Sequence, residues 1–182
     1  MSTVSKTLRS LLISGLLFTV TGAHAQNQET GETGPPDAEL LNFKNWAVRC
    51  VSNETSGEKK ACVMFQRLNL DSGQHLLTMQ VLKQQVNSED NKIVDTAVFA
   101  VPWGVHLKRG LGINVDDGEV YRVEYERCDP NGCYAGMILV DDMLQSMMKG
   151  NEARISFVEP SGKALSVPVS LSGFTAAYRS LP

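Results

Sequence analysis

Short segments in which apolar and polar residues alternate fill most of this chain. Residues 120–127 are a clear example, with Tyr121, Val123 and Tyr125 at one parity and charged residues at the other. A period of two places successive side chains on opposite faces of a β-strand. Many such segments separated by Gly, Asp and Asn turns are typical of a β-sandwich or a barrel. We therefore expect a mainly β fold.

Ten segments carry this strand pattern: residues 46–51, 62–70, 75–86, 93–101, 105–108, 111–115, 120–127, 133–140, 153–159 and 164–169. Two others have helical spacing. Met143, Leu144, Met147 and Met148 follow an acidic pair and precede Gly150, which are helix end signals. Near the C-terminus, apolar residues recur at i, i+3, i+4 and i+7 from Phe174. One or two short helices should accompany the strands.

The first 25 residues have the features of a secretory signal peptide. Lys6 and Arg9 precede an apolar run over residues 11–20, and a small-x-small site ends at Ala25. The run is too short to cross a bilayer. We expect cleavage near Ala25 and a periplasmic, outer-surface or secreted mature protein. Residues 26–39 are polar and predict a flexible leader, and 40–182 predict a single domain.

The charge of the chain argues against some classes of partner. The formal net charge is −3, and the predicted signal peptide carries two basic and no acidic residues, so the mature protein is more acidic. An acidic protein without a basic cluster is a poor candidate for binding nucleic acid or anionic lipid. No later apolar run is long enough for a transmembrane helix. The sequence does not predict the oligomeric state.

All four cysteines follow the predicted cleavage site, and an oxidising compartment favours disulfides. Three pairings are possible. Spacing favours Cys50 with Cys62 and Cys128 with Cys133, although a crossed pairing stays open. Asp-Pro-Asn-Gly between the second pair is strong turn chemistry, so a bond there would clasp a hairpin. A redox site would instead place C-x-x-C at a helix N-terminus.

Few residues offer metal-binding or catalytic chemistry. His75 and His106 lie on separate segments without further ligands at metal-binding spacing. Met143, Met147 and Met148 could bind Cu(I), but their helical spacing favours packing. Residues 87–91 resemble a calcium loop only in composition, and no G-x-S-x-G elbow occurs. We expect no cofactor, no metal site and no enzymatic activity.

Trp103 and Tyr134 lie near turns, where an exposed aromatic side chain can anchor a partner. A buried core role is the favoured interpretation for both residues.

An ordered set of motifs resembles the invasion-associated locus B family of exported bacterial proteins. The set comprises Trp46-Ala47-Val48-Arg49-Cys50 with Cys62, Pro102-Trp103-Gly104-Val105-His106-Leu107 with Gly110, Val115-Asp116, Cys128 with Gly132-Cys133, Gly150, and Val167-Pro168-Val169-Ser170-Leu171 with Gly173-Phe174. The resemblance implies an immunoglobulin-like β-sandwich, stapled by two disulfides, at the periplasm or outer surface. It brings no catalytic residues, and it implies an association with entry into host cells, including erythrocytes.

Three functional hypotheses follow. The first is a non-enzymatic envelope protein that binds another protein, either an envelope component or a host surface, and contributes to host-cell invasion. The second is a periplasmic binder of a small molecule or of copper, through the sandwich interior or the methionine helix. The third, a hydrolase or thiol oxidoreductase, has the least support.

Overall fold

The computed structural model describes residues 38–51, 61–86 and 92–182, all within one compact unit that extends from Gly34 to Pro182. The predicted signal peptide and the first twelve residues of the predicted leader lie outside the described residues. So do the polar loop after Val51 and the calcium-like stretch at 87–91.

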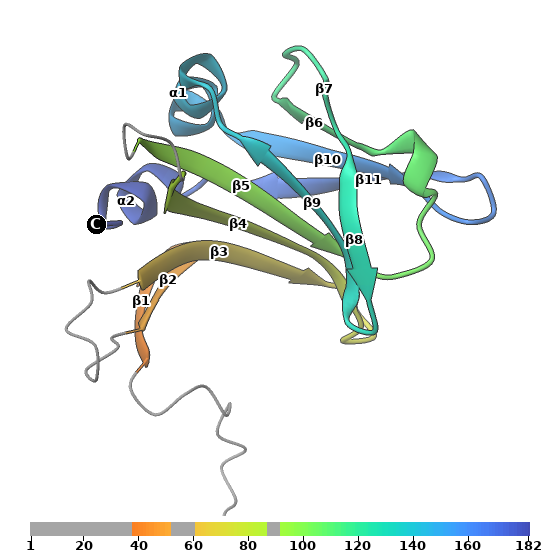
Figure 1. Ribbon diagram of the computed structural model, residues 1–182, viewed down its shortest axis with the longest axis horizontal. Coiled ribbons are helices and arrows are strands. Elements are labelled where there is room, and N and C mark those ends of the chain that lie inside the picture. Colours follow the sequence, from red (N-terminus) through yellow and green to blue (C-terminus); the bar gives the residue numbers. More distant parts are fainter. Residues whose placement is uncertain (1–37, 52–60, 87–91) are drawn as a thin grey trace, which may run out of the picture. The chain divides into compact units, whose positions relative to one another are not determined.

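The larger sheet has seven antiparallel strands (Figure 1). Five follow one another in chain order, and two return beside the fifth, so the order is β1-β2-β3-β4-β5-β9-β8. Their bounds are β1 Ala38–Phe43, β2 Trp46–Val51, β3 Ala61–Asn69, β4 His75–Gln85, β5 Ile93–Val101, β9 Gly132–Ile138 and β8 Tyr125–Asp129.

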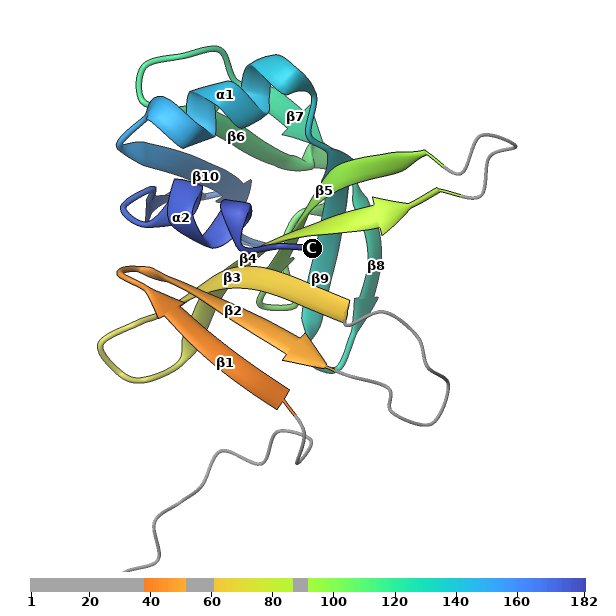
Figure 2. The ribbon, with the colours of Figure 1, turned by 90° about the vertical axis from the view of Figure 1, so that its left-hand side faces the viewer.

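The smaller sheet has four antiparallel strands in the order β11-β10-β6-β7. Helices α1 and α2 contact each other and lie at the same end of the sheets (Figures 1 and 2), and α2 also packs against β1 and β2. The bounds are β6 Leu111–Val115, β7 Tyr121–Val123, β10 Glu152–Val158, β11 Ala164–Ser170, α1 Asp141–Lys149, α2 Phe174–Arg179 and a 3-10 helix η1 Leu107–Arg109.

One hydrophobic core fills the space between the two sheets. Alternate residues of the strands point into it, as the period of two predicts, and both helices add their apolar faces. Trp46 and Phe174 pack edge to face with ring centroids 5.1 Å apart. The predicted mainly β, sandwich-like fold with two short helices and disulfide staples is confirmed.

A polar bridge joins the two sheets inside this core. Gln66 on β3, only 5% exposed, donates from Nε2 to the carbonyl oxygens of Asn45, at 2.9 Å, and Ser170, at 3.0 Å. The indole nitrogen of Trp46 donates to the same Ser170 oxygen at 2.8 Å. A buried amide is tolerated when its hydrogen bonds are made, so these bonds explain why a glutamine occupies this position.

Both disulfides link residues that lie directly opposite each other on neighbouring antiparallel strands. Cys50 on β2 bonds to Cys62 on β3, and Cys128 on β8 bonds to Cys133 on β9. The Cα atoms of each pair are 4.0 Å apart. This distance is nearer to the roughly 4.5 Å of non-hydrogen-bonded strand pairs than to the roughly 5.5 Å of hydrogen-bonded pairs.

Three expectations about the elements are corrected. The expected strand at residues 105–108 is a turn leading into η1, because Arg109 donates to the carbonyl of His106 and Gly110 donates to that of Leu107. The expected single strand at 120–127 divides at Glu124 into β7 and β8, which belong to different sheets. Strand β1 was not expected, and it begins at Ala38, so the last two residues of the predicted leader belong to it.

Candidate functional site

An open groove of about 460 Å³ lies on the surface of the described residues. Three parts of the fold form its walls: the turn from β3 into β4, the segment after β5, and the hairpin of β10 and β11. Most of the lining is apolar, and it includes Leu70, Leu76, Pro102, Trp103, Pro160 and Val167.

Trp103 is the most exposed large apolar side chain among the described residues, with 73% of its surface accessible. The favoured interpretation of a buried Trp103 is therefore wrong. Pro102 follows the last residue of β5, and Gly104 adopts φ +96°, so the chain turns away from the sheet at the indole. Exposed indole surface is unfavourable in water, and an indole beside an apolar groove is typical of a binding site.

The base of this tryptophan segment is fixed by the second disulfide. Val101, two residues before Trp103, pairs with Cys133 across β5 and β9. The backbone of Gly132 lies so close to the Val101 carbonyl that a Cβ there would overlap the oxygen. The clasped β8–β9 hairpin therefore supports the strand end from which the indole projects.

Polar groups in the groove are few. The Nε2 atom of His75 lies 2.8 Å from Thr78 Oγ1. Burial, and then the positive charge of Arg67, lower the pKa of His75 below its ordinary value of 6.5, so the imidazole is neutral at pH 7. Gln74 and Glu159 also line the groove. A mainly apolar surface with a few polar groups is the usual composition of a ligand site.

Other candidates from the sequence are not brought together. Across residues 38–51, 61–86 and 92–182, no three His, Cys, Asp or Glu side chains converge as a metal site would require. His75 lines the groove, whereas His106 is exposed before η1. Met143 and Met147 are buried in the core, as the packing interpretation expected.

Tyr134 is half-buried on β9 rather than fully inside the core. The guanidinium of Arg127, on the neighbouring strand β8, lies 4.0 Å from the centre of its ring. This is a close cation–π contact, so Tyr134 already has a partner within the chain.

The sequence does indicate that Trp103 lies outside the sheet, because the residue stands between a proline that ends a strand and a glycine that favours a turn. No local pattern in the sequence predicts the groove itself. Its walls come from segments up to about a hundred residues apart, and only the folded chain brings them together.

The fold and the groove define the class of the molecule: a small, disulfide-stapled β-sandwich with an open apolar groove. The model of the invasion associated locus B (IalB) protein family matches residues 46–182, and the chain belongs to this family. Within the described residues, no helix is long and apolar enough to cross a membrane.

Similar proteins support this membership. An invasion protein B homolog of Brucella abortus is 25% identical over 90% of this chain and 91% of its own length. Invasion protein B of Bartonella bacilliformis is 25% identical over 98% of this chain and 97% of its own length. The crystal structure of invasion associated protein B from Bartonella henselae shares the fold, with a TM-score of 0.65 and 21% identity over 78% of this chain and 92% of that one.

Proposed function

We propose that this protein is an exported, non-enzymatic binding module of the bacterial envelope, and that the groove beside Trp103 receives a partner protein. The observation that carries the proposal is the indole of Trp103, 73% exposed at the rim of an apolar groove. Tryptophan is among the residues most often found at the energetic centre of an interface. The clasp at Cys128–Cys133 holds this segment in place before a partner arrives, which lowers the ordering cost of binding.

Export is part of the proposal, and two features support it. The N-terminal residues have the pattern of a signal peptide. All four cysteines form disulfides, as is usual in the periplasm and outside the cell. The mature protein would then be periplasmic, displayed at the outer surface or secreted.

A contribution to host-cell invasion, including entry into erythrocytes, is the finer part of the proposal. Its support is the family and the name "invasion protein B" carried by relatives of this chain. In this proposal the partner is an envelope component or a host surface protein, and the groove provides the contact.

Binding of labelled protein to erythrocytes and to envelope vesicles tests the proposal. Trp103→Ala should weaken binding at least tenfold, because truncation of a central aromatic residue commonly costs about 2 kcal/mol or more. Val120→Ala is the matched control, since Val120 is 62% exposed and does not line the groove. Equal binding by the two variants and the wild type would remove the groove from the proposal.

Binding of a small molecule is the second candidate, and the volume of the groove favours it. Ligand pockets usually measure roughly 300–1,000 Å³, and this groove falls within that range. Trp103 supplies the readout, because its fluorescence should shift to shorter wavelength when a ligand covers the indole. A shift produced by the low-mass fraction of an envelope extract, and abolished in Trp103→Phe, would favour this candidate over a protein partner.

A further inference from the structure

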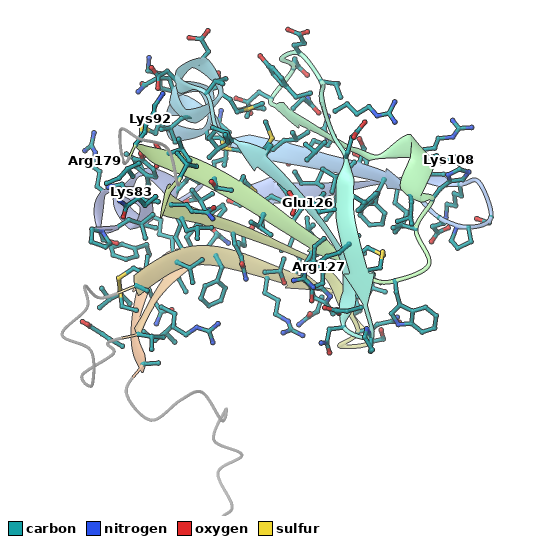
Figure 3. The ribbon with its side chains drawn as sticks, in the orientation of Figure 1. Lys83, Lys92, Lys108, Glu126, Arg127 and Arg179 are labelled. Carbon is teal, nitrogen blue, oxygen red and sulfur yellow. A yellow bond between two sulfur atoms is a disulfide. The ribbon has the colours of Figure 1, made fainter. Side chains whose placement is uncertain are left out.

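The two sheets have four edge strands, and three of them carry features that oppose further strand pairing. Strand β7 is only three residues long, and β11 contains Pro168, which has no N–H to donate. Strand β8 presents Glu126 and Arg127, as Figure 3 shows, and its register shifts between Tyr125 and Arg127. Natural sheets use short length, proline, charge and irregular pairing to prevent association through their edges.

Strand β1, at the other edge of the larger sheet, is not short, contains no proline and has no irregular pairing. It is six residues long and pairs with β2 in an unbroken register. Its single charged residue is Glu39, and its centre is Leu40 and Leu41, of which Leu40 is 52% exposed. A regular, apolar edge of this kind is suited to accept another strand.

The turn between β1 and β2 determines which backbone groups of β1 face outward. Phe43 pairs with Trp46 across a two-residue turn, and the pair that closes such a turn is hydrogen-bonded. Residues alternate in an antiparallel pair, so Phe43, Leu41 and Glu39 bond to β2, whereas Asn42, Leu40 and Ala38 direct their N–H and C=O groups outward. The 4.0 Å Cα separation of Cys50 and Cys62 agrees with this phase, since it marks a non-hydrogen-bonded pair on the other side of β2.

We propose that β1 pairs with β1 of a second copy of this chain, antiparallel and about a two-fold axis at Leu40. The two seven-stranded sheets would then form one continuous sheet. In this register Leu40 lies opposite Leu40 of the second copy, Ala38 lies opposite Asn42, and Glu39 lies opposite Leu41. No like charges are opposed, and the outward groups of each strand match those of its copy.

This self-complementarity is the reason for choosing a second copy as the occupant. An isologous two-fold contact needs a surface that matches itself, and an antiparallel pair of identical strands meets that condition. Five paired residues per chain, 38–42, give a small contact, below the roughly 1,000 Å² expected of a stable interface. The association is therefore weak and reversible, and its assay requires high protein concentrations.

Sedimentation velocity over a concentration series tests the association. The wild type should shift from monomer to dimer, and Leu40→Lys should weaken the association at least tenfold by placing two positive charges opposite each other. Leu107→Lys is the matched control, because Leu107 is also 52% exposed and lies on η1, away from β1. A wild type that stays monomeric, or a Leu40→Lys variant that dimerises like the control, overturns the proposal.

Cross-linking tests the register. All four native cysteines are bonded, so an introduced cysteine is the single free thiol of the chain. Under mild oxidation Leu40→Cys should form a covalent dimer. Leu41→Cys should not, because the two introduced residues would lie about two positions apart, beyond the roughly 7 Å limit for a disulfide. Equal cross-linking of both variants would refute the axis at Leu40.

The inference does not depend on the groove. Trp103→Ala should dimerise like the wild type, and Leu40→Lys should bind a partner at the groove like the wild type. The failure of one proposal can therefore be distinguished from the failure of the other.

Discussion

The polar bridge between the sheets gives the sharpest test of how this fold is held together. Gln66→Met keeps the length of the side chain but removes both donated hydrogen bonds. Each bond contributes about 1 kcal/mol net, so the free energy of unfolding should fall by about 2 kcal/mol. The Ser170 carbonyl keeps its bond from Trp46, which is why the loss should not be larger.

Urea denaturation measures this change. With a slope of about 1–3 kcal/mol per molar urea, the midpoint should fall by roughly 1 M. Gln80→Met is the control, because Gln80 lies on the outer face of the neighbouring strand β4, opposite Phe65. The control should leave the midpoint nearly unchanged.

A double-mutant cycle with Trp46→Phe then shows whether the two donors to Ser170 act together. Donors that share an acceptor should give non-additive changes in unfolding free energy. If Gln66→Met has the same midpoint as Gln80→Met, or a higher one, the bridge contributes no net stability and the reasoning is refuted.

Three further predictions concern stability. Gly173→Ala should destabilise the fold by more than about 3 kcal/mol in thermal melts, because φ is +95° and a Cβ there would overlap a backbone oxygen. Gly162→Ala is the control, since Gly162 has φ +85° but lies in open space, and it should cost about 1 kcal/mol. Removing the Cys50–Cys62 disulfide should lower the free energy of unfolding by about 0.8 kcal/mol more than removing Cys128–Cys133, because the loop that it closes is longer. Equal losses of stability in urea denaturation would contradict this. Burial raises the pKa of Tyr125 to about 12, so the Tyr125 hydroxyl ionises at lower pH in the unfolded chain than in the folded one. The free energy of unfolding should therefore fall as pH rises from 10 to 12, and it should fall less steeply in Tyr125→Phe.

Alternation along the chain was sufficient to predict most strands, because a half-buried strand must place every second residue in the core. The segment 164–169 illustrates this, since Val167 and Val169 are both buried as the pattern requires. The helix ending at Lys149 was also predictable from its spacing and its Gly150 stop. These features depend on neighbours in sequence, so local reasoning finds them.

The errors arise where the outcome depends on distant contacts. In residues 120–127 the inward-facing residues stay at every second position throughout. Tyr121, Val123 and Tyr125 all face the interior, although the chain passes from one sheet to the other between them. A period of two cannot distinguish that corner from a straight strand. Residues 105–108 alternate over too few positions to exclude a turn.

The candidate site was the least predictable part. Trp103 was identified as a possible anchor, but composition favours burial for any tryptophan. Pro102 and Gly104 indicate that the chain leaves the sheet at Trp103, but the exposure of the indole also depends on where the β10–β11 hairpin lies, which cannot be inferred from the residues beside it.

The contacts around Ser170 and Gly173 can form only after most of the domain has been synthesised. Trp46 and Gln66 lie on β2 and β3, yet the carbonyl oxygen of Ser170 that accepts from both is more than a hundred residues later in the chain. These hydrogen bonds of β2 and β3 can therefore form only after Ser170 has been synthesised. A chain stopped at residue 165 should remain sensitive to protease, whereas a chain that extends to residue 182 should be resistant.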